Sequence, residues 1–166
     1  MATGPRYKVA FRRRRENRTD YYARRRLLTS QEPRAIVRRS NKNVSIQFAD
    51  FGMEGDSILA SATTRELKAM GWNYSCSSIP AAYLVGFLAG KRAIKAGIEY
   101  AVLDIGMQTV QHGGVLFATV SGMIDAGLEV PCSEDVLPEE DRLNGKHIDD
   151  AIEAAVAALK DKMEAE

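Results

Sequence analysis

The chain has little cysteine and histidine, and no long apolar run. Its 2 cysteines, Cys76 and Cys132, lie far apart in the sequence and fit no zinc-ligand spacing. They could form a disulfide, but two free thiols in a reducing compartment are the favoured interpretation. The first residues contain no apolar stretch, so we expect no secretory signal. Tyrosine and glutamate among the early arginines also disfavour an organelle presequence.

The longest apolar run covers residues 79–90, and Lys91 and Arg92 follow it directly. A helix that crosses a bilayer needs roughly twenty apolar residues, so this run is too short. It is better explained as a central helix of a packed core.

Acidic residues are scarce at the N-terminus and abundant after it. Residues 1–42 hold 14 Lys/Arg and 3 Asp/Glu, a net charge of +11. Residues 43–166 hold 9 Lys/Arg and 19 Asp/Glu, a net charge of −10. A segment as basic as the first cannot bury enough apolar surface to fold by itself. It needs a polyanion, usually a phosphate backbone, whereas an acidic body disfavours binding to an anionic membrane.

Aromatic residues are interleaved with the arginines of this basic arm, at Tyr7, Phe11, Tyr21 and Tyr22. Arginine outnumbers lysine 12 to 2 within residues 1–42. Bases offer faces on which aromatic rings stack, and the planar guanidinium holds phosphate through two hydrogen bonds. The pattern therefore favours nucleic acid, and RNA in particular. The alternatives are a solvated arm without a fixed partner and a nuclear-localisation-like tract.

The hydrophobic pattern predicts helix in the arm and strands after it. Residues 12–28 lack glycine and proline, so we expect an extended tip and then a helix that becomes firm on a partner and ends before Pro33. Residues 34–39, 44–49 and 57–63 read as strands, the second with strict two-residue alternation. Their short connections imply an antiparallel meander.

The second half predicts alternating strands and helices. A helix from Ser77 or Ser78 to Gly97 has Pro80 in its first turn, and its glycines at 86 and 90 would let another backbone approach. A strand over 99–104, a helix over 114–126 and a strand over 128–130 imply a parallel pair. Residues 131–144 read as loop, and 148–163 as a last helix.

The sequence thus predicts an α/β fold with a mixed sheet. An antiparallel three-strand meander is followed by a βαβα unit, with helices packed on the sheet, a basic N-terminal arm and a C-terminal helix. We divide the chain into the arm at 1–32, a mixed α/β core domain at 33–131, and an acidic loop with the C-terminal helix at 132–166.

A second basic patch lies at the predicted hairpin tip, residues 38–43. It could be an ordinary polar turn, but its serine and asparagines could also contact sugar hydroxyls and base edges in unpaired RNA. The sequence offers only weak catalytic patterns. Gly86 to Arg92 lacks the spacing of a phosphate loop, His112 and His147 have no companion metal ligands, and Asp104 lacks the further acids of a carboxylate nuclease. We expect no catalytic residue, no metal and no cofactor, although His112 could contact an anion.

Five segments together resemble one family, the archaeal form of large-subunit ribosomal protein L-eighteen. The segments are the basic start at 4–28, the hairpin at 38–42, the central helix Ser78-Ile-Pro-Ala-Ala-Tyr-Leu-Val-Gly-Phe-Leu-Ala-Gly90, Ala101-Val-Leu-Asp-Ile-Gly106 and Ile124-Asp-Ala-Gly-Leu-Glu-Val-Pro131. The resemblance covers roughly residues 4–150, and the chain length suits the archaeal branch.

The resemblance implies a cytoplasmic, non-enzymatic ribosomal protein that binds 5S rRNA and anchors it to the large-subunit (23S-type) rRNA in the central protuberance. Neighbouring large-subunit proteins would be further partners. The main alternative is an adaptor whose acidic body binds basic proteins. The residues expected to contact RNA are Arg6, Tyr7, Lys8, Phe11, Arg12, Arg13, Arg14, Arg15, Arg18, Tyr21, Tyr22, Arg24, Arg25, Arg26, Arg38, Arg39, Ser40, Asn41, Lys42 and Asn43.

Overall fold

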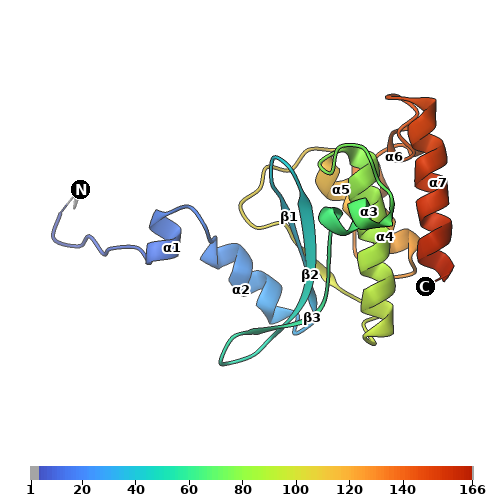
Figure 1. The fold of residues 1–166 in the computed structure, drawn as a ribbon. Coiled ribbons are helices and arrows are strands. Elements are labelled where there is room, and N and C mark those ends of the chain that lie inside the picture. The colour runs from blue at the N-terminus through green and yellow to red at the C-terminus, as the bar shows by residue number, and fades with distance from the viewer. Residues whose placement is uncertain (1–3, 166) are drawn as a thin grey trace.

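Alternating apolar residues build a sheet of four strands in the computed structural model, which describes residues 4–165 (Figure 1). Strands β1 (Arg34–Arg39), β2 (Val44–Phe51) and β3 (Asp56–Thr63) pair antiparallel in sequence order. Strand β4 (Val102–Asp104) adds to β1 in parallel, so the order is β3-β2-β1-β4. The predicted mixed sheet and its meander are confirmed, and β3 and β4 form the two edges.

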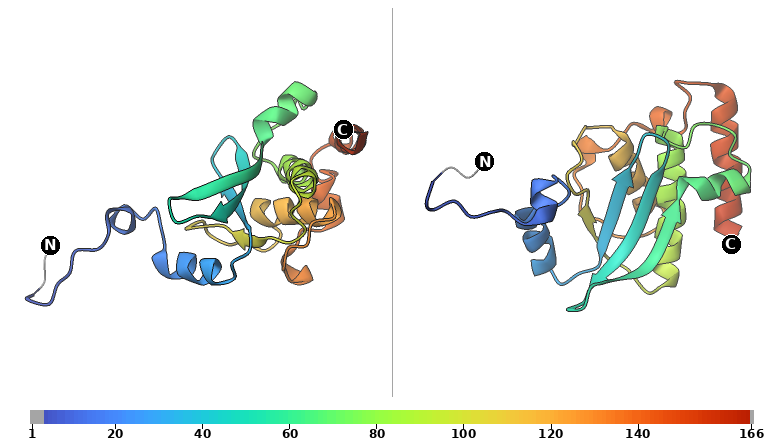
Figure 2. Two further views of the ribbon diagram at one scale, coloured as in Figure 1. Left: turned by 90° about the horizontal axis from the view of Figure 1, so that it is seen from below. Right: turned by 60° about the vertical axis from the view of Figure 1, so that its left-hand side comes forward.

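The core lies on one face of the sheet. Side chains such as Val37, Ile46 and Phe48 are fully buried there. They are covered by helices α4 (Ile79–Lys95) and α5 (Val115–Asp125), which pack against each other and against the strands. The arm leaves from the opposite side, so the sheet separates the arm from the two core helices (Figures 1 and 2).

Helices α4 and α5 touch backbone to backbone through glycines, as the sequence predicts. A Cβ atom added at Gly86 would overlap the carbonyl oxygen of Thr119, and one at Gly122 would overlap the carbonyl oxygen of Tyr83. The missing side chains therefore allow the backbones of α4 and α5 to approach closely. The start of α4 also agrees with the prediction, since Ser78 is its N-cap and Pro80 lies in its first turn.

The arm contains two helices where the sequence predicts an extended tip followed by one helix. Helix α1 (Arg12–Arg15) ends before Asn17, whose φ of 52° breaks the helical path. Helix α2 (Tyr21–Thr29) then begins at Asp20, whose carboxylate accepts hydrogen bonds from the N–H groups of Tyr22 and Ala23. This cap starts a new helix at a place the propensity pattern could not reveal.

Three short helices lie where the sequence predicts none. Helix α3 (Thr64–Met70) follows β3 directly, and a capping box between Thr63 and Glu66 starts it. The predicted loop over 131–144 contains the 3-10 helix η1 (Glu134–Val136) and helix α6 (Glu140–Leu143). The predicted strand over 128–130 is reduced to one parallel bridge between Tyr100 and Glu129.

The last helix, α7 (Asp150–Ala165), packs against α4. Its predicted apolar face is confirmed, since Ile152, Val156, Leu159 and Met163 are all buried, whereas Ile148 lies before the helix and is exposed. Cys76 and Cys132 are free thiols. No helix in residues 4–165 has the length and apolar character that crossing a membrane requires.

Candidate nucleic-acid interface

The arm presents its arginines to solvent. All four residues of α1 are exposed, and α2 has no fully buried residue. Arg15, Arg25 and Arg26 form no ion pair within the described part of the chain. These guanidinium groups are therefore available to an anion without breaking an internal contact.

Aromatic side chains hold the two arm helices together. The rings of Phe11 and Tyr21 lie 5.2 Å apart at an angle of 57°, and the Arg14 guanidinium lies 5.2 Å from the centre of the Tyr22 ring. Phe11 is 71% exposed and Tyr22 69% exposed, so each keeps a face open to solvent. The aromatic residues can therefore brace the arm and still offer surface to a base.

The ion pairs within α1 and its following turn are weak. Glu16 lies 3.9 Å from Arg12 and 3.4 Å from Arg18, and all three side chains are at least 40% exposed. Exposed pairs of this kind contribute about 0–1 kcal/mol. A phosphate could displace Glu16 from either arginine at little cost.

A hollow of about 410 Å³ lies between the arm and the β1–β4 side of the sheet. Arginines line it on both sides: Arg13, Arg18 and Arg26 from the arm, and Arg38 from β1. The chain therefore brings the hairpin arginine close to the arm, a proximity that sequence spacing alone does not give.

The turn at the hairpin tip is stabilised internally. The Ser40 hydroxyl donates to the carbonyl of Asn43 at 2.9 Å and accepts from its N–H at 3.1 Å. The side chain of Gln108, from the loop before α5, accepts a 3.1 Å hydrogen bond from the N–H of Arg39 and donates one of 2.6 Å to its carbonyl. Ser40 is thus engaged in the turn, while Arg39, Asn41 and Lys42 remain exposed.

A second hollow, of about 400 Å³, joins this turn to the loop over residues 105–114. Its polar lining includes Arg39, Asn41, Gln108, Thr109 and Gln111. The last three are candidate contact residues that the sequence interpretation did not include. Only His112, an exposed residue in the same loop, had been considered there.

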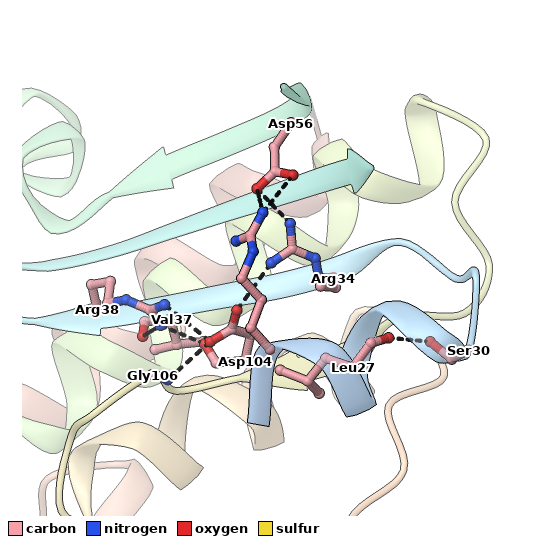
Figure 3. Close-up of polar contacts among 9 residues, drawn as sticks. Leu27, Ser30, Arg34, Val37, Arg38, Asp56, Asp104 and Gly106 are labelled. Carbon is pink, nitrogen blue, oxygen red and sulfur yellow. Dashed lines mark hydrogen bonds and ion pairs between the residues drawn. The ribbon is translucent and has the colours of Figure 1, made fainter. Parts of the chain in front are cut away.

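A line of alternating charges crosses the outer face of the sheet (Figure 3). Arg34 is 1% exposed and donates to Asp56 at 2.6 Å and to Asp104 at 3.2 Å. Arg24 of α2 donates to both Asp56 oxygens, at 3.0 and 3.1 Å. At the other end, Arg38 donates to Asp104 Oδ1 at 3.0 Å and to its backbone carbonyl at 2.6 Å. Arg24 and Arg38, both predicted RNA contacts, therefore already have carboxylate partners on the sheet.

The arginines set the ionisation of Asp56. Partial burial by itself raises the pKa of this carboxyl group. Hydrogen bonds and charge from Arg34 and Arg24 outweigh the burial, so the pKa is held below its ordinary value. Asp56 is thus a firm anionic partner for both arginines at neutral pH.

Comparison with known proteins identifies the family. A family model described as "Ribosomal large subunit proteins 60S L5, and 50S L18" matches residues 5–99. Proteins named "Large ribosomal subunit protein uL18" are 53% identical in Natronomonas pharaonis, 50% in Korarchaeum cryptofilum and 54% in Caldivirga maquilingensis. Each match spans 89% of this chain and, respectively, 80%, 76% and 72% of the relative. The chain belongs to this family of large-subunit ribosomal proteins.

Membership of this family assigns the protein a structural role, not an enzymatic one, in the large ribosomal subunit. The ribosome is a cytoplasmic particle. Membership also gives a context for Asp104, the residue for which a nuclease role had been weighed. Its two carboxylate oxygens accept from Arg34, Arg38 and the N–H of Gly106, so this acid serves the architecture of the sheet.

Arg34 is the residue of this region whose importance the sequence interpretation missed. The sequence pattern indicates only that it begins a strand. Its partners lie 22 and 70 residues away, so no local pattern could reveal them. A signal was nonetheless present, because an arginine that begins an otherwise apolar strand requires a carboxylate partner if it is buried.

Proposed function

We propose that the protein binds 5S rRNA and anchors it to the large-subunit rRNA in the central protuberance. The proposal rests on the exposed arginines of α1 and α2, which extend on the far side of the sheet from the core helices (Figure 2). A ribosomal protein with a cationic arm and an acidic body can enter RNA with the arm while the body remains outside.

The arm would supply most of the phosphate contacts. Its exposed arginines have at most weak internal partners, and arginine holds phosphate through two parallel hydrogen bonds. Tyr7, Phe11 and Tyr22 expose ring faces on which unpaired bases could stack. This combination suits folded RNA with unpaired loops better than a uniform duplex.

The hairpin tip would fix the register of the body on the RNA. Gln108 and the hydrogen-bonded turn hold Arg39, Asn41 and Lys42 on a stiff support. A rigid set of donors beside a polar hollow can distinguish one RNA shape from another, which mobile charges cannot do. The arm would then give affinity and the hairpin would give selectivity.

The decisive test measures binding to a 5S transcript and to an unrelated structured RNA of equal length. Replacing Arg12–Arg15 with alanine should weaken 5S binding strongly and flatten its salt dependence. For six to ten phosphate contacts, the affinity of the unaltered protein should fall roughly 10³–10⁵-fold between 50 and 200 mM salt.

A matched control removes four exposed basic residues from the body: Lys68, Arg142, Lys146 and Lys162. This variant loses the same formal charge and should retain most of its affinity and its salt dependence. If the two variants lost equal affinity for 5S RNA, net charge alone would explain the interaction. Absence of any preference for the 5S transcript in the unaltered protein would refute the proposed function.

The anchoring part of the proposal needs a separate measurement. The protein should form a ternary complex with 5S RNA and a fragment of large-subunit rRNA that neither RNA forms alone. Purification from its own cells without ribonuclease should also recover an RNA of the size of 5S. Recovery of basic proteins alone, after ribonuclease treatment, would favour the adaptor interpretation.

A further inference from the structure

We propose that the five-residue charge relay Arg24–Asp56–Arg34–Asp104–Arg38 sets the position of the arm before RNA arrives. Arg24 then acts as a positioning residue, although the sequence suggested a phosphate contact. This inference rests on the proposed function, since it concerns how the same arm and hairpin are presented to RNA.

Arg34 is the fixed centre of the relay. Its strand neighbour on β2 is Ala49, which is buried and small, and the Arg34 guanidinium reaches from β1 to Asp56 on β3 (Figure 3). Burying a guanidinium is costly unless carboxylates surround it, and Asp56 and Asp104 meet that requirement from two different strands. The relay therefore has little freedom to rearrange at its centre.

The arm is attached at one end of this centre. Helix α2 has no fully buried residue, and its apolar residues Leu27 and Leu28 are only partly covered. Among the described residues, the contact of Arg24 with Asp56 is the ion pair that connects α2 to the sheet. Apolar packing alone would leave the angle of this helix weakly determined.

The hairpin is attached at the other end. Arg38 donates to Asp104 and to the carbonyl of Val37, which holds its guanidinium against the start of the 105–114 loop. The turn of the hairpin begins two residues later, at Ser40. One relay thus connects both proposed RNA-binding elements, and its centre, Arg34 with Asp104, is buried.

Preorganisation has a measurable consequence for binding. An arm that is already positioned does not lose orientational freedom when RNA binds, so less of the interaction energy is consumed by ordering. The alternative is that Arg24 leaves Asp56 for a phosphate during binding. The two mechanisms predict opposite effects when the carboxylate is removed.

The test uses Asp56→Asn in the full chain, with Glu54→Gln as its matched control. Both substitutions remove one negative charge from the same hairpin, but Glu54 is exposed and has no ion-pair partner among residues 4–165. Electrostatics alone predicts that both variants bind 5S RNA slightly more tightly. The relay predicts that Asp56→Asn binds about tenfold more weakly than Glu54→Gln, because its arm must be ordered on binding.

A second readout needs no RNA. Spin labels at Arg25→Cys on α2 and Lys68→Cys on α3, in a chain carrying Cys132→Ser, report the distance between arm and body. The distribution should be narrow in the otherwise unaltered protein and in Glu54→Gln, and broad in Asp56→Asn. Equal widths in all three would overturn the relay, whether or not the RNA assay succeeds.

A second, more conservative pair of substitutions keeps the test valid if Asp56→Asn does not fold. Arg24→Lys keeps the charge and leaves Arg34 with both of its carboxylates, but it loses the planar group that spans Asp56. Arg25→Lys is its control on the exposed side of α2. Weaker 5S binding by Arg24→Lys than by Arg25→Lys supports the relay if the spin-label distances in Arg24→Lys are also broadened, because loss of a phosphate contact alone would leave them narrow. Equal or tighter binding contradicts the relay. If the unaltered protein itself shows no 5S preference, the proposed function fails while the distance measurement still decides the relay.

Discussion

Tyr83 on α4 accepts a 2.8 Å hydrogen bond from the ammonium group of Lys160 on α7, and its hydroxyl donates to Asp125 at 2.6 Å. The same ammonium group lies 5.5 Å from the centre of the Tyr83 ring and 5.3 Å from that of Phe87. This contact joins the C-terminal helix to the pair of core helices at one point.

We expect Lys160→Met to loosen α7 without unfolding the sheet. The substitution keeps most of the apolar stem but removes the donor to Tyr83, which should cost about 1–2 kcal/mol in the free energy of unfolding. Hydrogen exchange should increase in α7 and stay unchanged in β1 and β2. Lys146→Met, at an exposed position, should leave both regions as they are, and similar exchange in the two variants would contradict the assignment.

The pKa of Tyr83 should lie above the ordinary value of a phenol. Burial raises its pKa, and the hydrogen bond and charge of Asp125 raise it further. Because the folded pKa lies above the unfolded value, this stabilisation is complete below about pH 10 and is lost as the pH rises through the folded value. An alkaline absorbance titration should show a phenol above the ordinary range whose pKa falls in Asp125→Asn but stays raised by burial. A titration unchanged by that substitution would refute the hydrogen bond.

Gly86→Ala should be strongly destabilising. The new methyl group would collide with the backbone of Thr119, and neither helix can withdraw because each packs on the sheet or on α7. Overpacking of this kind should cost about 3 kcal/mol in the free energy of unfolding. Gly71→Ala, which meets no atom within 4 Å but has a φ of 111°, should cost only about 1–2 kcal/mol. Denaturant unfolding of both variants measures the two losses in the free energy of unfolding. A larger loss for Gly71→Ala than for Gly86→Ala would exclude the backbone contact as the cause.

Acid should release the arm before it unfolds the core. The pKa of Asp56 is lowered in the folded protein, so its contribution to stability is complete above about pH 4 and disappears as the pH falls through the lowered value. The difference in the free energy of unfolding between the unaltered protein and Asp56→Asn should therefore shrink in acid. The corresponding difference for Glu54→Gln should stay small throughout. A difference for Asp56→Asn that stays undiminished as the pH falls from about 5 to about 2 would contradict the lowered pKa.

Local pattern was enough to predict the meander, the central helix and the apolar face of α7. Two-residue alternation in β2 and the glycines of α4 are properties of short segments, so neighbouring residues determine them. The capping box that starts α3 was equally local: Thr63 and Glu66 have the required spacing, and the signal was present but not used.

The rest depended on contacts between distant residues. Residues 128–130 carry strand-forming residues, yet they make only the bridge of Glu129 to Tyr100. The roles of Arg24, Arg34 and Arg38 follow from Asp56 and Asp104, which lie on other strands. Composition predicts that the arm binds a polyanion, but it could not separate the arginines that face outward from those that already have carboxylate partners on the sheet.

The open edge at β3 has a consequence for unassembled copies. Its Ile58 and Leu59 are 49% and 47% exposed, and none of the described strands pairs with its outer side. A bare strand with apolar side chains is a template for stacking one molecule onto the next. Surplus protein made without its ribosomal partners should therefore aggregate through this edge.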